Sequence, residues 1–105
     1  MAASEVIERL EQLIEGRVRE RPEGSYVTRL VDGGEPAIAA KIREEAAELC
    51  NATTQVDSAH EAADLLFHVL VLLGIRRVGF GAVCGELERR FGTSGLAEKA
   101  ARRSP

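Results

Sequence analysis

The sequence has few of the residues that mark secreted or disulfide-stapled proteins. Among its 105 residues there is no tryptophan, and the only two cysteines are Cys50 and Cys84. No signal-peptide pattern precedes them, so free thiols in a reducing cytosol are favoured over a disulfide or a zinc site. We expect both cysteines to be small core residues of a cytoplasmic protein.

The sequence also lacks a strong excess of one charge and a long hydrophobic run. It has 14 Lys and Arg residues against 17 Asp and Glu, a net charge of -3, which gives no general attraction to nucleic acid or anionic membranes. The longest apolar stretch, Leu65 to Ile75, contains a histidine and is shorter than the ~20 residues that span a bilayer. We interpret it as a core helix and expect neither nucleic acid nor membrane as a partner.

What the chain does contain is helical periodicity over the length of one domain. We expect Ser4 to cap the first helix, Pro22 to follow its end, and Pro36 to lie in the first turn of the third helix. The fourth helix carries apolar residues on every side between Val69 and Leu73, as expected at the centre of a bundle. The expected helices are residues 4–21, 25–32, 36–53, 58–77, 80–91 and 95–103 of a single domain, residues 1–105. The fold class is therefore all-α, a helical bundle built on an antiparallel helix hairpin and completed by dimerisation.

Two acidic clusters lie on the two helices of this hairpin. Glu45 and Glu48 are three residues apart, as are Glu61 and Asp64, so each pair shares a helix face. In an antiparallel hairpin, residues equally far from the turn lie side by side, which places Glu48 opposite Glu61 and Glu45 opposite Asp64. Four carboxylates at one place repel unless a cation lies between them, and oxygen ligands suit Mg²⁺ or Mn²⁺.

Simpler interpretations of the same acids remain open. Ser58 and Glu61 match a capping box, in which Glu61 bonds back to the helix N-terminus. The acids of the third helix match a solvated face whose partners are Lys41 and Arg43. The mirrored spacing of the two pairs about one turn favours the metal site.

Other catalytic patterns have little support. A di-iron bundle needs two Glu-x-x-His pairs, which the sequence does not contain, and neither glycine-rich phosphate-binding motif is present. We expect His68 to be a core residue or to hydrogen-bond Asp64 one turn back.

The stretch "EEAAEL" followed by "EAADLLFHVLVLL" resembles the E-E-x-x-E…E-x-x-D signature of the all-α nucleoside triphosphate pyrophosphohydrolases, the MazG-like superfamily. Three stretches are similar to the narrower phosphoribosyl-ATP pyrophosphohydrolase family: "SYVTRL", "KIREEAAEL" and "GLAEKAARR". The resemblance covers about residues 5–103. Val27 and Arg43 stand where that family usually has threonine and glycine.

The resemblance implies a substrate, a cofactor and a set of site residues. The reaction would be hydrolysis of the α–β phosphoanhydride of phosphoribosyl-ATP to phosphoribosyl-AMP and pyrophosphate, the second step of histidine biosynthesis. It implies that Mg²⁺, with Mn²⁺ as an alternative, is held by Glu45, Glu48, Glu61 and Asp64. Candidate catalytic residues are Glu44, which would position or deprotonate water, and Glu45; candidate substrate contacts are Ser25, Tyr26, Lys41, Lys99 and Arg102. It also implies a homodimer or a dimer of dimers.

Two other functions fit the same residues. A house-cleaning pyrophosphohydrolase acting on dUTP, dCTP or a damaged nucleotide would use the same acids, because they recognise metal and triphosphate rather than base. A non-enzymatic helical dimerisation module would carry them as solvated charges.

Overall fold

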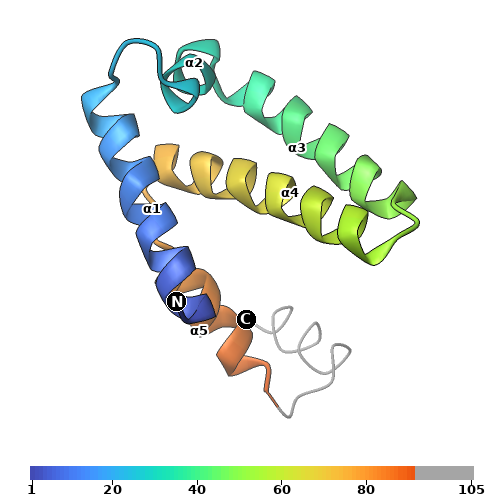
Figure 1. Ribbon diagram of the computed structural model, residues 1–105. Coiled ribbons are helices and arrows are strands. Elements are labelled where there is room, and N and C mark those ends of the chain that lie inside the picture. Colours follow the sequence, from blue (N-terminus) through green and yellow to red (C-terminus); the bar gives the residue numbers. More distant parts are fainter. Residues whose placement is uncertain (92–105) are drawn as a thin grey trace, which may run out of the picture.

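The computed structural model describes residues 1–91, whose regular structure is entirely helical (Figure 1). The helices of this part of the chain are α1 (Ala3–Glu20), α2 (Tyr26–Gly33), α3 (Glu35–Asn51), α4 (Gln55–Ile75) and α5 (Phe80–Arg89). The all-α prediction is confirmed. The expected helix at 95–103 lies outside the described residues, as do Lys99 and Arg102.

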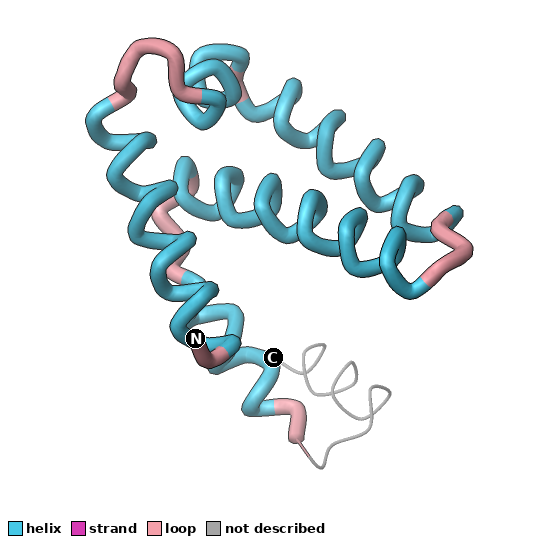
Figure 2. Tube along the Cα trace, viewed as in Figure 1, coloured by secondary structure: helices cyan, strands magenta, loops and turns pink. Residues whose placement is uncertain are grey.

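Helices α3 and α4 form the antiparallel hairpin, and local sequence explains both of its ends. Figure 2 shows the short loop at the turn. There the Thr54 hydroxyl accepts a hydrogen bond from the Asp57 amide at 3.0 Å and caps α4. At the opposite end, the Arg76 guanidinium lies 2.9 Å from the Glu35 carboxylate and joins the end of α4 to the start of α3. Gly34, at φ 85°, links α2 to α3 in a conformation that favours glycine.

The buried core is small and lies away from the hairpin turn. Its fully buried apolar side chains are Ile14 of α1, Val27 of α2, Ile38 of α3, and Leu70 and Val71 of α4. Helix α1 crosses the C-terminal half of α4 (Figure 1), so this half of the hairpin is covered. The half nearer the turn extends beyond α1, and it carries the acidic residues.

Several local expectations were wrong. Helix α1 begins at Ala3, with Ala2 at the N-cap position and no capping bond from Ser4 in the described chain. Helix α4 begins at Gln55 with Thr54 as its cap, so Glu61 lies inside the helix and the capping-box interpretation fails. The segment Val69 to Leu73, by contrast, fits its expected central position, because Leu70 and Val71 are buried and the other three residues are half-buried.

Both cysteines are exposed, which corrects the expectation that they lie in the core. Cys50 is the residue after the half-buried Leu49 of α3, and one step along a helix turns a side chain by about 100° away from the packed stripe. Cys84 lies on α5, a helix with no fully buried residue in the described chain.

Helix α4 as a whole is longer than the apolar stretch seen in the sequence. Its 21 residues are long and apolar enough to span a membrane by length and composition alone. The helix packs against α1, α2 and α3, and it carries Glu61 and Asp64 within its first half. These features are consistent with a core helix of a soluble protein.

Candidate active site

Glu45 occupies a position of α3 that an apolar residue would ordinarily fill. The inward stripe of this helix runs Ile38, Ile42, Glu45 and Leu49 at spacings of four, three and four residues. Glu45 as a whole residue is only 5% exposed, whereas Glu48 is exposed at the margin of the stripe. A buried carboxylate costs several kcal/mol unless it is paired or coordinates a cation.

The facing stripe of α4 changes character along its length. It runs Glu61, Asp64, His68 and Val71, at spacings of three, four and three residues. Val71 belongs to the core and His68 is buried, while the two acids lie on the half of the hairpin that α1 does not cover. The hairpin is therefore apolar at its core end and acidic toward the turn.

The structure places the four predicted acids in two overlapping groups rather than in one. Glu45, Glu48 and Glu61 each present a carboxylate oxygen such that the three atoms lie within 4.8 Å of one another. Glu61 and Asp64 form a second such group with His60, whose Nε2 is 3.3 Å from Asp64 Oδ2. Glu61 thus belongs to both groups.

The electrostatics of these acids are unfavourable in the absence of a cation. Burial raises the pKa of Glu45 above its ordinary value, and the negative charges of Glu48 and Asp64 raise it further. The pKa of Glu61 is raised first by a hydrogen bond with Glu48, which requires one of the two to be protonated, and then by burial. With all these carboxyls ionised, neither Glu48 nor Glu61 has a proton to donate.

The donor set fits a hard divalent cation. Glu45 Oε2 and Glu61 Oε2 are both buried and have no hydrogen-bond partner within residues 1–91. A buried acceptor without a donor is costly, and a cation between these oxygens would satisfy both. Carboxylate oxygens are the ligands that Mg²⁺ and Mn²⁺ take in proteins.

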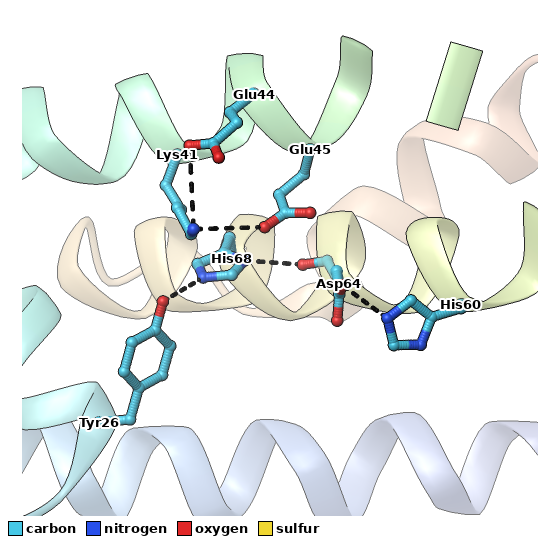
Figure 3. Close-up of polar contacts among 7 residues, drawn as sticks. All are labelled: Tyr26, Lys41, Glu44, Glu45, His60, Asp64 and His68. Carbon is cyan, nitrogen blue, oxygen red and sulfur yellow. Dashed lines mark hydrogen bonds and ion pairs between the residues drawn. The ribbon is translucent and has the colours of Figure 1, made fainter. Parts of the chain in front are cut away.

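Lys41 supplies positive charge beside this cluster (Figure 3). Its Nζ lies 3.7 Å from Glu45 Oε1 and 3.8 Å from Glu44 Oε2, and the pKa of Lys41 is raised, with Glu44 as the largest cause. The Glu44 side chain is 58% exposed and lies outside both groups of clustered acids. Lys41 therefore connects the buried Glu45 to a carboxylate that remains accessible to solvent.

Tyr26 reaches the hairpin from α2 through His68 (Figure 3). The Tyr26 hydroxyl is 2.8 Å from His68 Nε2, and His68 Nδ1 is 2.8 Å from the backbone oxygen of Asp64. The expected contact of His68 with Asp64 is present, although it involves the main chain. The pairing with Tyr26 could not be predicted from the sequence, because helix periodicity does not specify how α2 packs on α4.

Ser25 has a local structural role. It is buried, caps α2 by accepting a hydrogen bond from the Thr28 amide at 3.4 Å, and accepts another from Arg17 Nη1 at 3.4 Å. These contacts do not involve the acids of α3 and α4. His60 was also missed as a neighbour of Asp64; their four-residue separation on one helix was the available signal.

Comparisons with known proteins show which family the chain resembles. The family model described as phosphoribosyl-ATP pyrophosphohydrolase matches residues 7–91. A phosphoribosyl-ATP pyrophosphatase of Rhodopirellula baltica is 48% identical over 91% of this chain and 85% of its own. Proteins of the same name from Nitrosospira multiformis and Rhizorhabdus wittichii are 44% and 50% identical, over 99% and 91% of this chain and 88% and 93% of their own lengths.

Proposed function

The chain belongs to the phosphoribosyl-ATP pyrophosphohydrolase family, and we infer that it hydrolyses the α–β phosphoanhydride of phosphoribosyl-ATP. The products are phosphoribosyl-AMP and pyrophosphate, and the reaction is the second step of histidine biosynthesis. The observation that carries this conclusion is similarity of 44–50% identity to phosphoribosyl-ATP pyrophosphatases over nearly the whole chain.

We propose that Glu45, Glu48, Glu61 and Asp64 hold Mg²⁺, with Mn²⁺ as an alternative. The proposal is supported by the convergence of carboxylate oxygens from α3 and α4 and by the two buried oxygens that have no hydrogen-bond partner among residues 1–91. When bound, the cation would neutralise negative charge on the phosphate oxygens and so favour departure of pyrophosphate.

Glu44 is proposed as the residue that orients and deprotonates water. Its carboxylate is exposed and lies next to the cluster, so it is accessible to a water molecule directed at the α-phosphorus. The water oxygen forms a bond to phosphorus, the bond to the oxygen bridging the α- and β-phosphates breaks, and the water proton passes to Glu44. Glu45 is the alternative base, but its burial and its position among the acids fit a ligand better.

Lys41 is proposed as a phosphate contact. Its ammonium lies between Glu44 and Glu45, where an incoming triphosphate would compete for the same positive charge. Lys99 and Arg102 remain proposed phosphate contacts on sequence grounds, since both lie outside the described residues. Ser25 is proposed to act indirectly, by capping the helix that carries Tyr26.

We also propose that the protein is a cytoplasmic homodimer or dimer of dimers. Within residues 1–91 the core contains five buried apolar side chains, and several large apolar residues are exposed. Leu13 of α1, Val56 of α4 and Leu87 of α5 are 50%, 79% and 52% exposed, and Phe91, just beyond α5, is 77% exposed. Light scattering at micromolar concentration tests this, and a monomer would contradict it.

The substrate assignment is tested by measuring pyrophosphate release from phosphoribosyl-ATP and from a panel of nucleoside and deoxynucleoside triphosphates. We expect turnover of phosphoribosyl-ATP to exceed that of every panel member. Turnover of dUTP or dCTP without turnover of phosphoribosyl-ATP would favour the house-cleaning activity. Absence of all turnover with Mg²⁺ or Mn²⁺ would favour the non-enzymatic module.

A further inference from the structure

His68 is a buried polar residue whose two ring nitrogens both have partners. The side chain is 5% exposed, and its partners lie on different elements of the structure. Nδ1 contacts the backbone oxygen of Asp64 within α4, and Nε2 contacts the Tyr26 hydroxyl of α2, each at 2.8 Å. The imidazole therefore links α2 to the turn of α4 that carries Asp64.

The two contacts determine where the imidazole proton lies. A carbonyl oxygen can only accept, so Nδ1 must carry a hydrogen and donate it to Asp64. In a neutral ring Nε2 is then an acceptor, and Tyr26 must donate its hydroxyl proton to it. The hydroxyl proton of Tyr26 is consequently directed at His68 and is not available to a phosphate oxygen.

The ring of Tyr26 is fixed by aromatic and cationic neighbours as well. The ring stacks on Phe67 of α4, with 6.1 Å between the two centroids. The guanidinium of Arg29, also on α2, lies 5.5 Å from the centroid of the Tyr26 ring. These contacts orient the ring, while the hydroxyl contact with His68 sets its position along α4.

We propose that His68 is a positioning residue: as the Nδ1-protonated tautomer it holds the Tyr26 hydroxyl and so fixes α2 against the α3–α4 hairpin beside the acidic cluster. The proposal rests on the proposed function, because Tyr26 matters to catalysis only if the substrate binds beside the acids of α3 and α4. In this proposal the Tyr26 hydroxyl binds His68 rather than the substrate, so its contribution to substrate binding is indirect. Loss of the contact should weaken substrate binding more than it slows the chemical step.

The tautomer can be tested without substrate by ¹⁵N-correlated NMR of the imidazole groups. The chain has only two histidines, so a His60→Gln variant leaves His68 as the sole signal. We expect protonated Nδ1 and unprotonated Nε2, with the Nε2 resonance moving in Tyr26→Phe. The matched control is Thr28→Val on the same helix as Tyr26. It removes the hydrogen bond from the Thr28 hydroxyl to the Pro22 carbonyl and should leave the His68 signals in place. A protonated Nε2, or no response to Tyr26→Phe, would overturn the proposal.

Kinetics then test the consequence. We expect His68→Leu and Tyr26→Phe each to raise KM by roughly two- to tenfold, the range for one lost hydrogen bond, with kcat within about twofold. The double variant should be no worse than His68→Leu, and His68→Gln, whose amide oxygen can accept from Tyr26, should recover most of the loss. Additive effects, or a fall in kcat with KM unchanged, would contradict the proposal. Absence of wild-type turnover would instead contradict the proposed function, and the NMR result would still decide the role of His68.

Discussion

Glu48 of α3 and Glu61 of α4 face each other across the hairpin, close enough that a hydrogen bond between them raises the pKa of Glu61. Two carboxyls can make this contact only when one is protonated. At neutral pH the arrangement is therefore one of repulsion between like charges unless a cation intervenes. This pair links the fold of the hairpin to the proposed chemistry.

Replacing Glu48 by Gln should abolish most turnover while leaving the fold intact. We expect pyrophosphate release from phosphoribosyl-ATP to fall at least ~100-fold, because an oxygen ligand loses its charge. Asp64→Asn should behave in the same way. The matched control is Glu88→Gln on the exposed surface of α5, which should retain wild-type activity. Full activity of Glu48→Gln would contradict the assignment of Glu48 as a ligand of the cation.

A divalent cation should stabilise the native protein through the same acids. At Mg²⁺ or Mn²⁺ concentrations of about 100 times Kd, binding contributes about 2.7 kcal/mol, which raises Tm by on the order of 10 °C in a chain of this size. Thermal unfolding with and without EDTA measures the effect. In Glu45→Gln the cation-dependent increase should largely disappear; an increase equal to that of the wild type would contradict the assignment of Glu45 as a ligand.

The metal-free protein should become more stable on mild acidification from neutral pH. The pKa values of Glu45 and Glu61 are raised above 4.5 in the folded state, so the native protein binds more protons than the unfolded chain. Their stabilising contribution is complete below pH 4.5 and is lost as pH rises through the raised pKa values. Urea denaturation at pH 7 and about pH 5, with EDTA present, measures the free energy of unfolding.

The comparison for this pH effect is the double variant Glu45→Gln/Glu61→Gln. It lacks both titrating groups, so its stability should increase less between the two pH values. An equal increase in the wild type and the double variant would assign the effect to other groups.

Thr54→Ala should destabilise the protein by about 0.5–2 kcal/mol, the usual cost of losing an N-cap hydroxyl. The structure places the Thr54 hydroxyl on the Asp57 amide at the start of α4, whereas Ser58 lies inside the helix. Ser58→Ala should therefore change the free energy of unfolding by less than about 0.5 kcal/mol. Urea denaturation of the two variants compares them directly, and a larger loss in Ser58→Ala would restore the capping-box interpretation.

The sequence predicts the acidic cluster well because helix periodicity and hairpin symmetry are both local rules. The spacing of Glu45 and Glu48, mirrored by Glu61 and Asp64, already implies facing carboxylates once a short turn joins the helices. The boundary of α4 was less predictable, because Thr54 and Ser58 are both acceptable caps and their sequence context does not rank them.

Packing between elements was the part that sequence could not supply. The Tyr26–His68 contact depends on how α2 folds back over α4, and the exposure of Cys50 and Cys84 depends on which faces of α3 and α5 are covered. Both are tertiary properties without a periodic signal in one sequence.

Whether the acids of the hairpin hold a catalytic cation is tested by pyrophosphate release from phosphoribosyl-ATP by the EDTA-treated protein as Mg²⁺ is titrated back, with Glu48→Gln measured in parallel. We expect negligible release without Mg²⁺, saturable recovery in the wild type, and little recovery in the variant. Equal release with and without the cation, or full recovery in Glu48→Gln, would contradict this expectation.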